Sequence, residues 1–140
     1  MKHASAILSI LLLVAAGAVA DVQSNVQPFP KVLINAKYVY VTSYDGGQFS
    51  PYLLPEDRQA ISTVQDALQK WGRYVVVYRP EDADMIIAVQ SRGSEDVLAV
   101  YDTRPISPTY LWRAMGRGGL DKGEVPLVAK LRAAVEQAAR

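Results

Sequence analysis

The segment 55–72 carries the clearest folding signal in the sequence, because it has the pattern of an amphipathic helix with both ends marked. Pro55 suits the first position of a helix, and Gly72 offers a C-terminal stop. Glu56 and Asp57 complement the positive end of the helix dipole. The apolar residues between the ends recur at helical spacing: Ile61, Val64, Leu68 and Trp71. Such a helix must bury its apolar stripe against another layer, so the chain needs a sheet or a second helix beside it.

Segments rich in β-branched and aromatic residues supply that layer. The candidate strands are the second half of 32–44, then 73–79, 85–90, 97–102 and 110–115, separated by turns rich in Gly, Pro and Asp. The run 85–90 is nearly all apolar, as is typical of a strand buried on both faces. Pro126 opens a second amphipathic helix, 126–139. The order predicts an α/β (α+β) fold, with a single mixed sheet of about four to five strands packed with two main helices.

The first twenty residues have the layout of a secretory signal peptide. A basic start at Lys2 precedes an apolar run from Ala6 to Val14, and small residues end the segment at Ala18-Val19-Ala20. A retained membrane anchor is the alternative, but the apolar stretch is short for a span and lacks a basic flank. We therefore expect a signal peptide at 1–20, an extended leader that tethers the domain at 21–31, and one domain at 32–140. We expect no stable membrane span after cleavage, and an exported protein that is periplasmic or secreted.

The composition excludes several function classes. The chain has no cysteine, and its one histidine, His3, lies in the signal segment. The mature chain therefore cannot form the usual zinc or copper sites, a Ser-His-Asp triad or a redox dithiol. Lys2 is one of 15 Lys+Arg, so 14 remain against 14 Asp+Glu. A formally neutral chain lacks the basic surface of a nucleic-acid binder, and we expect neither a nucleic-acid partner nor a cofactor.

The glycine-rich segment 118–125, GGLDKGEV, invites comparison with a phosphate-binding loop. Gly118 and Gly123 have the separation of the Walker pattern, but Glu124 stands in place of the lysine and Val125 in place of the hydroxyl residue. A carboxylate at that point repels phosphate. The segment is therefore interpreted as an exposed, flexible loop that leads into the second helix.

Acidic clusters offer the remaining catalytic chemistry. Pairs of carboxylates can hydrolyse glycosides or bind calcium, but each cluster sits at a helix start or a turn, where acids commonly act as caps. Asp102-Thr103 begins like the aspartic-protease signature, yet Arg104 follows where glycine is required. A hydrolase that acts through Asp82, Asp84 or Asp102 remains the alternative function.

Tyrosines are the candidate binding residues. Tyr74 and Tyr78 share one face of their strand, and Tyr38 and Tyr40 share a face of another. Such rings either line a partner surface or sit at the edge of a core with the hydroxyl in water.

Basic residues surround the glycine segment. Arg113, Arg117 and Lys122 either form a weak anion-binding surface or are solvated loop charges, partly cancelled by nearby acids. We take Tyr74, Tyr78, Arg113 and Arg117 as the candidate partner surface.

The run ALQKWGRYVVVYRPEDADMIIAV, followed by VYD and LWR, resembles a pattern of small exported bacterial proteins. The resemblance covers most of 60–113 and the final helix. It is similar to uncharacterised envelope-lipoprotein domains, and more distantly to the α/β domains of curli-secretion-channel and penicillin-binding-protein-activator type. It implies an α/β envelope domain in which Trp71, Asp84, Asp102 and Trp112 are structural. This chain departs from those lipoproteins because it has no lipid-bearing cysteine.

These observations favour a non-catalytic domain of the bacterial envelope over an enzyme. We expect it to bind another envelope protein or a cell-wall component through its sheet or loops.

Overall fold

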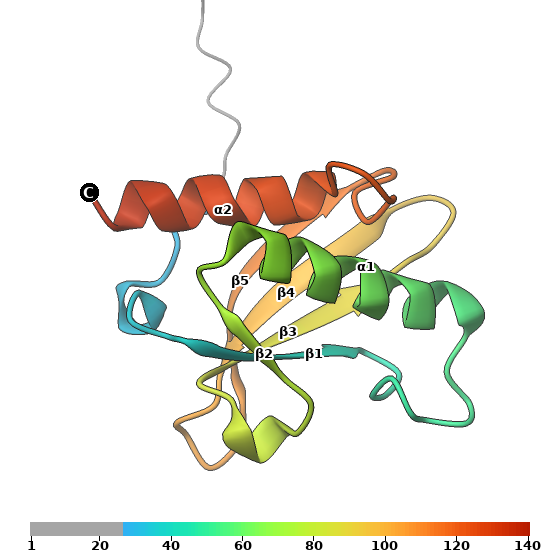
Figure 1. The fold of residues 1–140 in the computed structure, drawn as a ribbon, viewed down its shortest axis with the longest axis horizontal. Helices are drawn as coiled ribbons and strands as arrows, with labels where there is room; N and C mark the ends of the chain where they lie inside the picture. The colour runs from blue at the N-terminus through green and yellow to red at the C-terminus, as the bar shows by residue number, and fades with distance from the viewer. Residues whose placement is uncertain (1–26) are drawn as a thin grey trace, which may run out of the picture.

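The computed structural model describes residues 27–140 (Figure 1). The signal peptide expected at 1–20 and the first part of the leader lie outside these residues. The helices are α1 (Pro55–Trp71) and α2 (Pro126–Ala138), with short 3-10 turns η1 (Lys31–Leu33) and η2 (Pro80–Asp82). The strands are β1 (Tyr38–Ser43), β2 (Val75–Val77), β3 (Met85–Gln90), β4 (Asp96–Asp102) and β5 (Thr109–Gly116).

The five strands form one mixed sheet in the order β2-β1-β3-β4-β5. The strands β2 and β3 both run parallel to β1, on either side of it, and β3, β4 and β5 form an antiparallel meander. A register shift between Val100 and Tyr101 marks a bulge where β4 meets β5. The sequence prediction of a mixed sheet with two helices is thus confirmed.

Both helices lie on the same face of the sheet, which makes the domain two layers thick (Figure 1). The core between the layers is formed by the apolar stripes of the helices and by alternate residues of the central strands. The predicted start and end of α1 are correct. Gly72 ends this helix because its φ of 79° is left-handed, and its N–H donates to the Leu68 carbonyl at 3.1 Å.

The end of the expected leader belongs to the packed domain. Phe29 and Leu33 are buried in the core. The Trp112 Nε1–H donates to the Gln27 carbonyl at 2.6 Å, and the Gln27 side chain donates to the Leu111 carbonyl at 3.1 Å. Residues 27–31, expected as part of the leader, thus pack against the domain, and the Gln27 carbonyl supplies the acceptor that an indole buried beside Phe29 needs.

Candidate functional site

The face of the sheet that the helices leave uncovered, here called the open face, is the most distinctive surface of residues 27–140. On β2 and β1 it is formed by Val75, Val77, Tyr38, Tyr40 and Thr42. On β3 and β4 it is formed by Ile86, Ala88, Gln90, Val97, Ala99 and Tyr101. On β5 it is formed by Tyr110, Arg113 and Met115. Solvated sheet faces normally carry polar residues, whereas this one is mostly aliphatic and aromatic.

Large side chains on the open face are accessible to a partner. Tyr38, Val75 and Tyr110 are 39–45% exposed, and Met115 is 37% exposed. Ala88 and Ala99, by contrast, are buried although they point to the same face. These two alanines are small, and larger neighbouring side chains cover them. The accessible part of the open face is therefore formed by its larger residues.

Three tyrosines gather near Arg113 on this face. The rings of Tyr101 and Tyr110 meet edge to face with their centroids 5.8 Å apart. Tyr44 follows directly after β1 and is half-exposed. Partial burial, with the neighbouring Tyr101 hydroxyl as the next cause, raises the pKa of Tyr44 to about 12, although the Arg113 charge opposes this. The hydroxyl of Tyr44 therefore stays protonated at neutral pH and can donate a hydrogen bond.

The structure separates the four residues of the candidate partner surface. Tyr74 is buried, with its ring edge to face against Trp71 at 5.2 Å, and so cannot contact a partner. Tyr78 is exposed but lies beyond the end of β2. Arg113 lies on the open face, whereas Arg117 is exposed in the loop after β5. Tyr74 lies on the helix side because the chain places Val75 and Val77 on the open face and turns Tyr74 inward onto α1.

Sequence reasoning missed Tyr44, Tyr101 and Tyr110 as members of this surface. The alternation of residues along β4 already pointed to a second apolar face. Tyr101 and the apolar Ala99 occupy the positions of β4 that alternate with Leu98 and Val100, which are buried in the core. Apolar residues at both sets of positions indicate a strand with two apolar faces.

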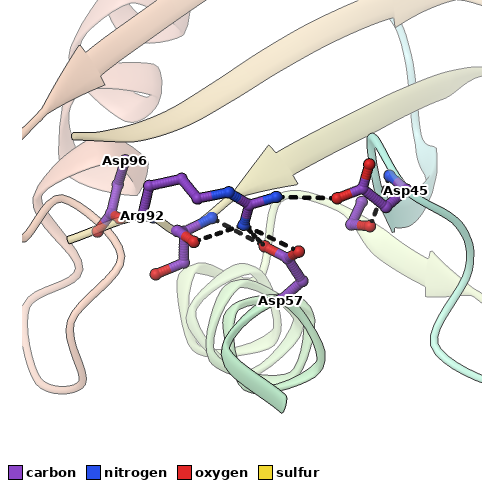
Figure 2. Close-up of polar contacts among 6 residues, drawn as sticks. Asp45, Asp57, Arg92 and Asp96 are labelled. Carbon is purple, nitrogen blue, oxygen red and sulfur yellow. Dashed lines mark hydrogen bonds and ion pairs between the residues drawn. The ribbon is translucent and has the colours of Figure 1, made fainter. Parts of the chain in front are cut away.

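A second cluster stands at the carboxyl ends of the adjacent parallel strands β1 and β3 (Figure 2). Asp57 in the first turn of α1 is fully buried. Its carboxylate accepts hydrogen bonds from the Ser91 N–H at 3.0 Å and from Arg92 Nη1 at 3.0 and 3.1 Å. Arg92 Nη2 also donates to Asp45 Oδ2 at 2.9 Å.

This clamp occupies the place where open α/β sheets usually bind ligands, outside the carboxyl ends of strands at the point where the strand order reverses. Here the crevice is filled by the chain itself, because Arg92 lies between Asp57 and Asp45 (Figure 2). Buried Asp96 extends the network, since its carboxylate accepts the N–H groups of Arg92 and Leu120. The cluster therefore ties α1, β1, the β3–β4 turn and the glycine segment together, which is a structural role.

The acids of the alternative hydrolase are also engaged within the fold. The Asp84 carboxylate accepts the N–H groups of Lys37 and Tyr38, and Asp82 pairs with Arg79. Hydrogen bonds from Arg104, at 2.8 and 2.9 Å, hold the pKa of Asp102 below its ordinary value. A general acid needs a raised pKa, so the pKa of Asp102 is shifted in the opposite direction.

Among residues 27–140, no group of three His, Cys, Asp or Glu side chains is placed to hold a metal ion.

The glycine segment is anchored at two buried residues, Leu120 and Val125, rather than lying wholly exposed as expected. Val125 has a left-handed φ of 46°, which is strained for a β-branched residue, and it leads directly into Pro126 of α2. A cavity of about 450 Å³ lies between this segment and the two helices. Its lining mixes acids and bases, including Lys122 and Glu124, so it does not form a uniformly charged site.

No family model, curated protein sequence or solved structure matches the chain. Within residues 27–140, neither helix has the length and apolar character needed to cross a bilayer.

Proposed function

We propose that this chain is an exported, non-catalytic domain of the bacterial envelope that binds another envelope component, a protein, with the open face of its sheet. The proposal combines two lines of support: the signal-peptide pattern of residues 1–20 in the sequence, and the chemistry of the open face in the structure.

The observation that carries the proposal is the apolar character of the open-face positions on the central strands. On β3 and β4 these positions hold Ile86, Ala88, Val97, Ala99 and Tyr101, with Gln90 as the one polar residue of the set. Strands covered on both faces have this composition, whereas strands with one wet face alternate apolar and polar residues. The helices cover one face (Figure 1). The second apolar face is accounted for if a partner covers it.

The residue types on the open face match those that dominate protein interfaces. Tyrosine, arginine and methionine are enriched in interface cores, and tyrosine and arginine are frequent energetic hot spots. Tyr101, Tyr110 and Arg113 lie on neighbouring strands, with Met115 beside them on β5. The aliphatic remainder, such as Val75 and Ile86, favours a protein partner over a polyhydroxylated glycan, which has few apolar groups to match it.

Site-specific photo-crosslinking in the cell tests the proposal. A photoreactive amino acid replaces Met115 on the open face in the full-length chain, and a matched variant carries it at Ala133, which is exposed on α2. We expect one specific adduct from position 115, recovered from the exported fraction, and none of that size from position 133. The proposal fails if position 115 yields no adduct, or if both positions yield the same set of adducts.

A further inference from the structure

The charged residues of the open face indicate what kind of partner can cover it. Arg113 is the one charged residue among the strand positions that form this face, and no carboxylate accompanies it. Its guanidinium makes no ion pair with any residue of 27–140. Arg92 and Arg104, by contrast, are both held by aspartates. Arg113 therefore stands exposed on a mostly apolar surface, and its guanidinium has no hydrogen-bond partner among residues 27–140.

Covering this face imposes a condition on the partner. Burial of a charged group without hydrogen-bond acceptors or a counter-charge costs several kcal/mol, so a partner that covers Arg113 must supply acceptors there, and an anionic group meets the charge best. A carboxylate is the matched ligand, because the planar guanidinium can donate two parallel hydrogen bonds to it.

A second copy of this chain docked open face to open face does not meet the condition. Its open face carries the same arginine and no acid, so packing two open faces together buries two guanidinium groups without a counter-charge. The complementary surface is therefore not the open face of a second copy.

We infer that the open face binds a different protein that presents an aspartate, glutamate or C-terminal carboxylate to Arg113, with apolar side chains around that carboxylate covering Tyr101, Tyr110 and Met115. This inference rests on the proposed function and names the chemistry of its partner. Arg113 is then the specificity-determining residue of the surface, because an apolar protein without an acid at this point is rejected.

The crosslink at position 115 provides the readout, measured in chains that also carry a substitution at Arg113. We expect the adduct yield to fall by about tenfold or more in Arg113→Gln and further in Arg113→Glu, with partial retention in Arg113→Lys. The matched control is Arg132→Gln, an exposed arginine on α2 away from the open face, which should leave the yield unchanged. Equal thermal unfolding of all four variants establishes that each is folded.

The identity of the adduct makes the test decisive. Mass spectrometry of the crosslinked peptide should reveal an acidic residue flanked by apolar ones in a different protein. Replacing that acid by lysine should restore the adduct of the Arg113→Glu chain, because the charges are then exchanged. If Arg113→Gln behaves like Arg132→Gln, or if the adduct has twice the mass of this chain, the inference is overturned while binding through the open face stands. Absence of any adduct at position 115 overturns both.

Discussion

The buried carboxylate of Asp57 gives the sharpest stability prediction. Asp57 has no exposed surface, and its two oxygens accept one backbone and two guanidinium contacts, all between 3.0 and 3.1 Å. In Asp57→Ala the Ser91 N–H loses its acceptor inside the protein, and the first turn of α1 loses a negative charge that complements its dipole. Arg92 keeps its contact with Asp45 and is partly in water, which limits the loss.

Breaking a buried ion pair typically costs 3–5 kcal/mol, and the remaining Asp45 contact lowers this, so we expect Asp57→Ala to reduce the unfolding free energy by about 2–4 kcal/mol. Asp57→Asn keeps the shape and one acceptor but loses the charge, and it should cost about 1–2 kcal/mol. For a domain of this size the larger value is a substantial fraction of the total stability.

Urea unfolding at pH 7, followed by the fluorescence of Trp71 and Trp112, measures both changes. The matched control is Asp66→Ala, since Asp66 is an exposed acid on the same helix, and its loss should change the unfolding free energy by no more than about 0.5 kcal/mol. If Asp57→Ala is no more destabilising than Asp66→Ala, the clamp does not hold the fold together as described.

Two further changes test the packing and the electrostatics. A Cβ on Gly119 would collide with the Leu127 side chain, at Cγ and at Cδ1, the latter only 2.8 Å away. Gly119→Ala should therefore lower the unfolding free energy measured in urea by about 1–3 kcal/mol. The control Gly93→Ala should be nearly neutral, because a Cβ there meets nothing within 4 Å. Because Arg104 holds the pKa of Asp102 below its ordinary value of 3.8, the ionised carboxylate stabilises the fold above that pH, and this contribution is lost as the pH falls through the lower folded pKa. Asp102→Asn should therefore flatten the acid-side fall of the urea midpoint, and parallel profiles for the two proteins would refute the assignment.

Local periodicity predicted the elements well because it reflects one segment at a time. The prediction for α1 has the correct bounds, Pro55–Trp71, since a proline start, an acidic first turn and a terminal glycine all act locally. The strand expected at 73–79 is only Val75–Val77 in the structure. An edge strand ends where its single neighbour stops pairing with it. The end of β2 therefore depends on β1 and cannot be predicted from the sequence of β2 alone.

Contacts between segments far apart in the sequence could not be predicted from local residue patterns. The packing of Gln27 against Trp112 joins residues 85 positions apart, and the bonds from Arg92 to Asp57 span 35. For the same reason the sequence identified tyrosines as binding candidates but selected the inward-facing Tyr74. The apolar run 85–90 predicted a strand covered on both faces. Within residues 27–140, the helices cover one face of this strand, and the other belongs to the open face (Figure 1).

The affinity of the crosslinked partner for this domain tests most directly whether the open face is the binding surface. Tyr110→Ala removes an exposed open-face ring that contacts Tyr101, while Gln69→Ala removes an exposed side chain of similar length from α1 on the opposite side of the domain. In calorimetric titrations of the purified partner, we expect Tyr110→Ala to weaken binding by about tenfold or more, as the loss of an interface tyrosine typically does, and Gln69→Ala to leave the affinity unchanged. Equal affinities for the two variants, or a larger loss in Gln69→Ala, would contradict the assignment of the open face as the binding surface.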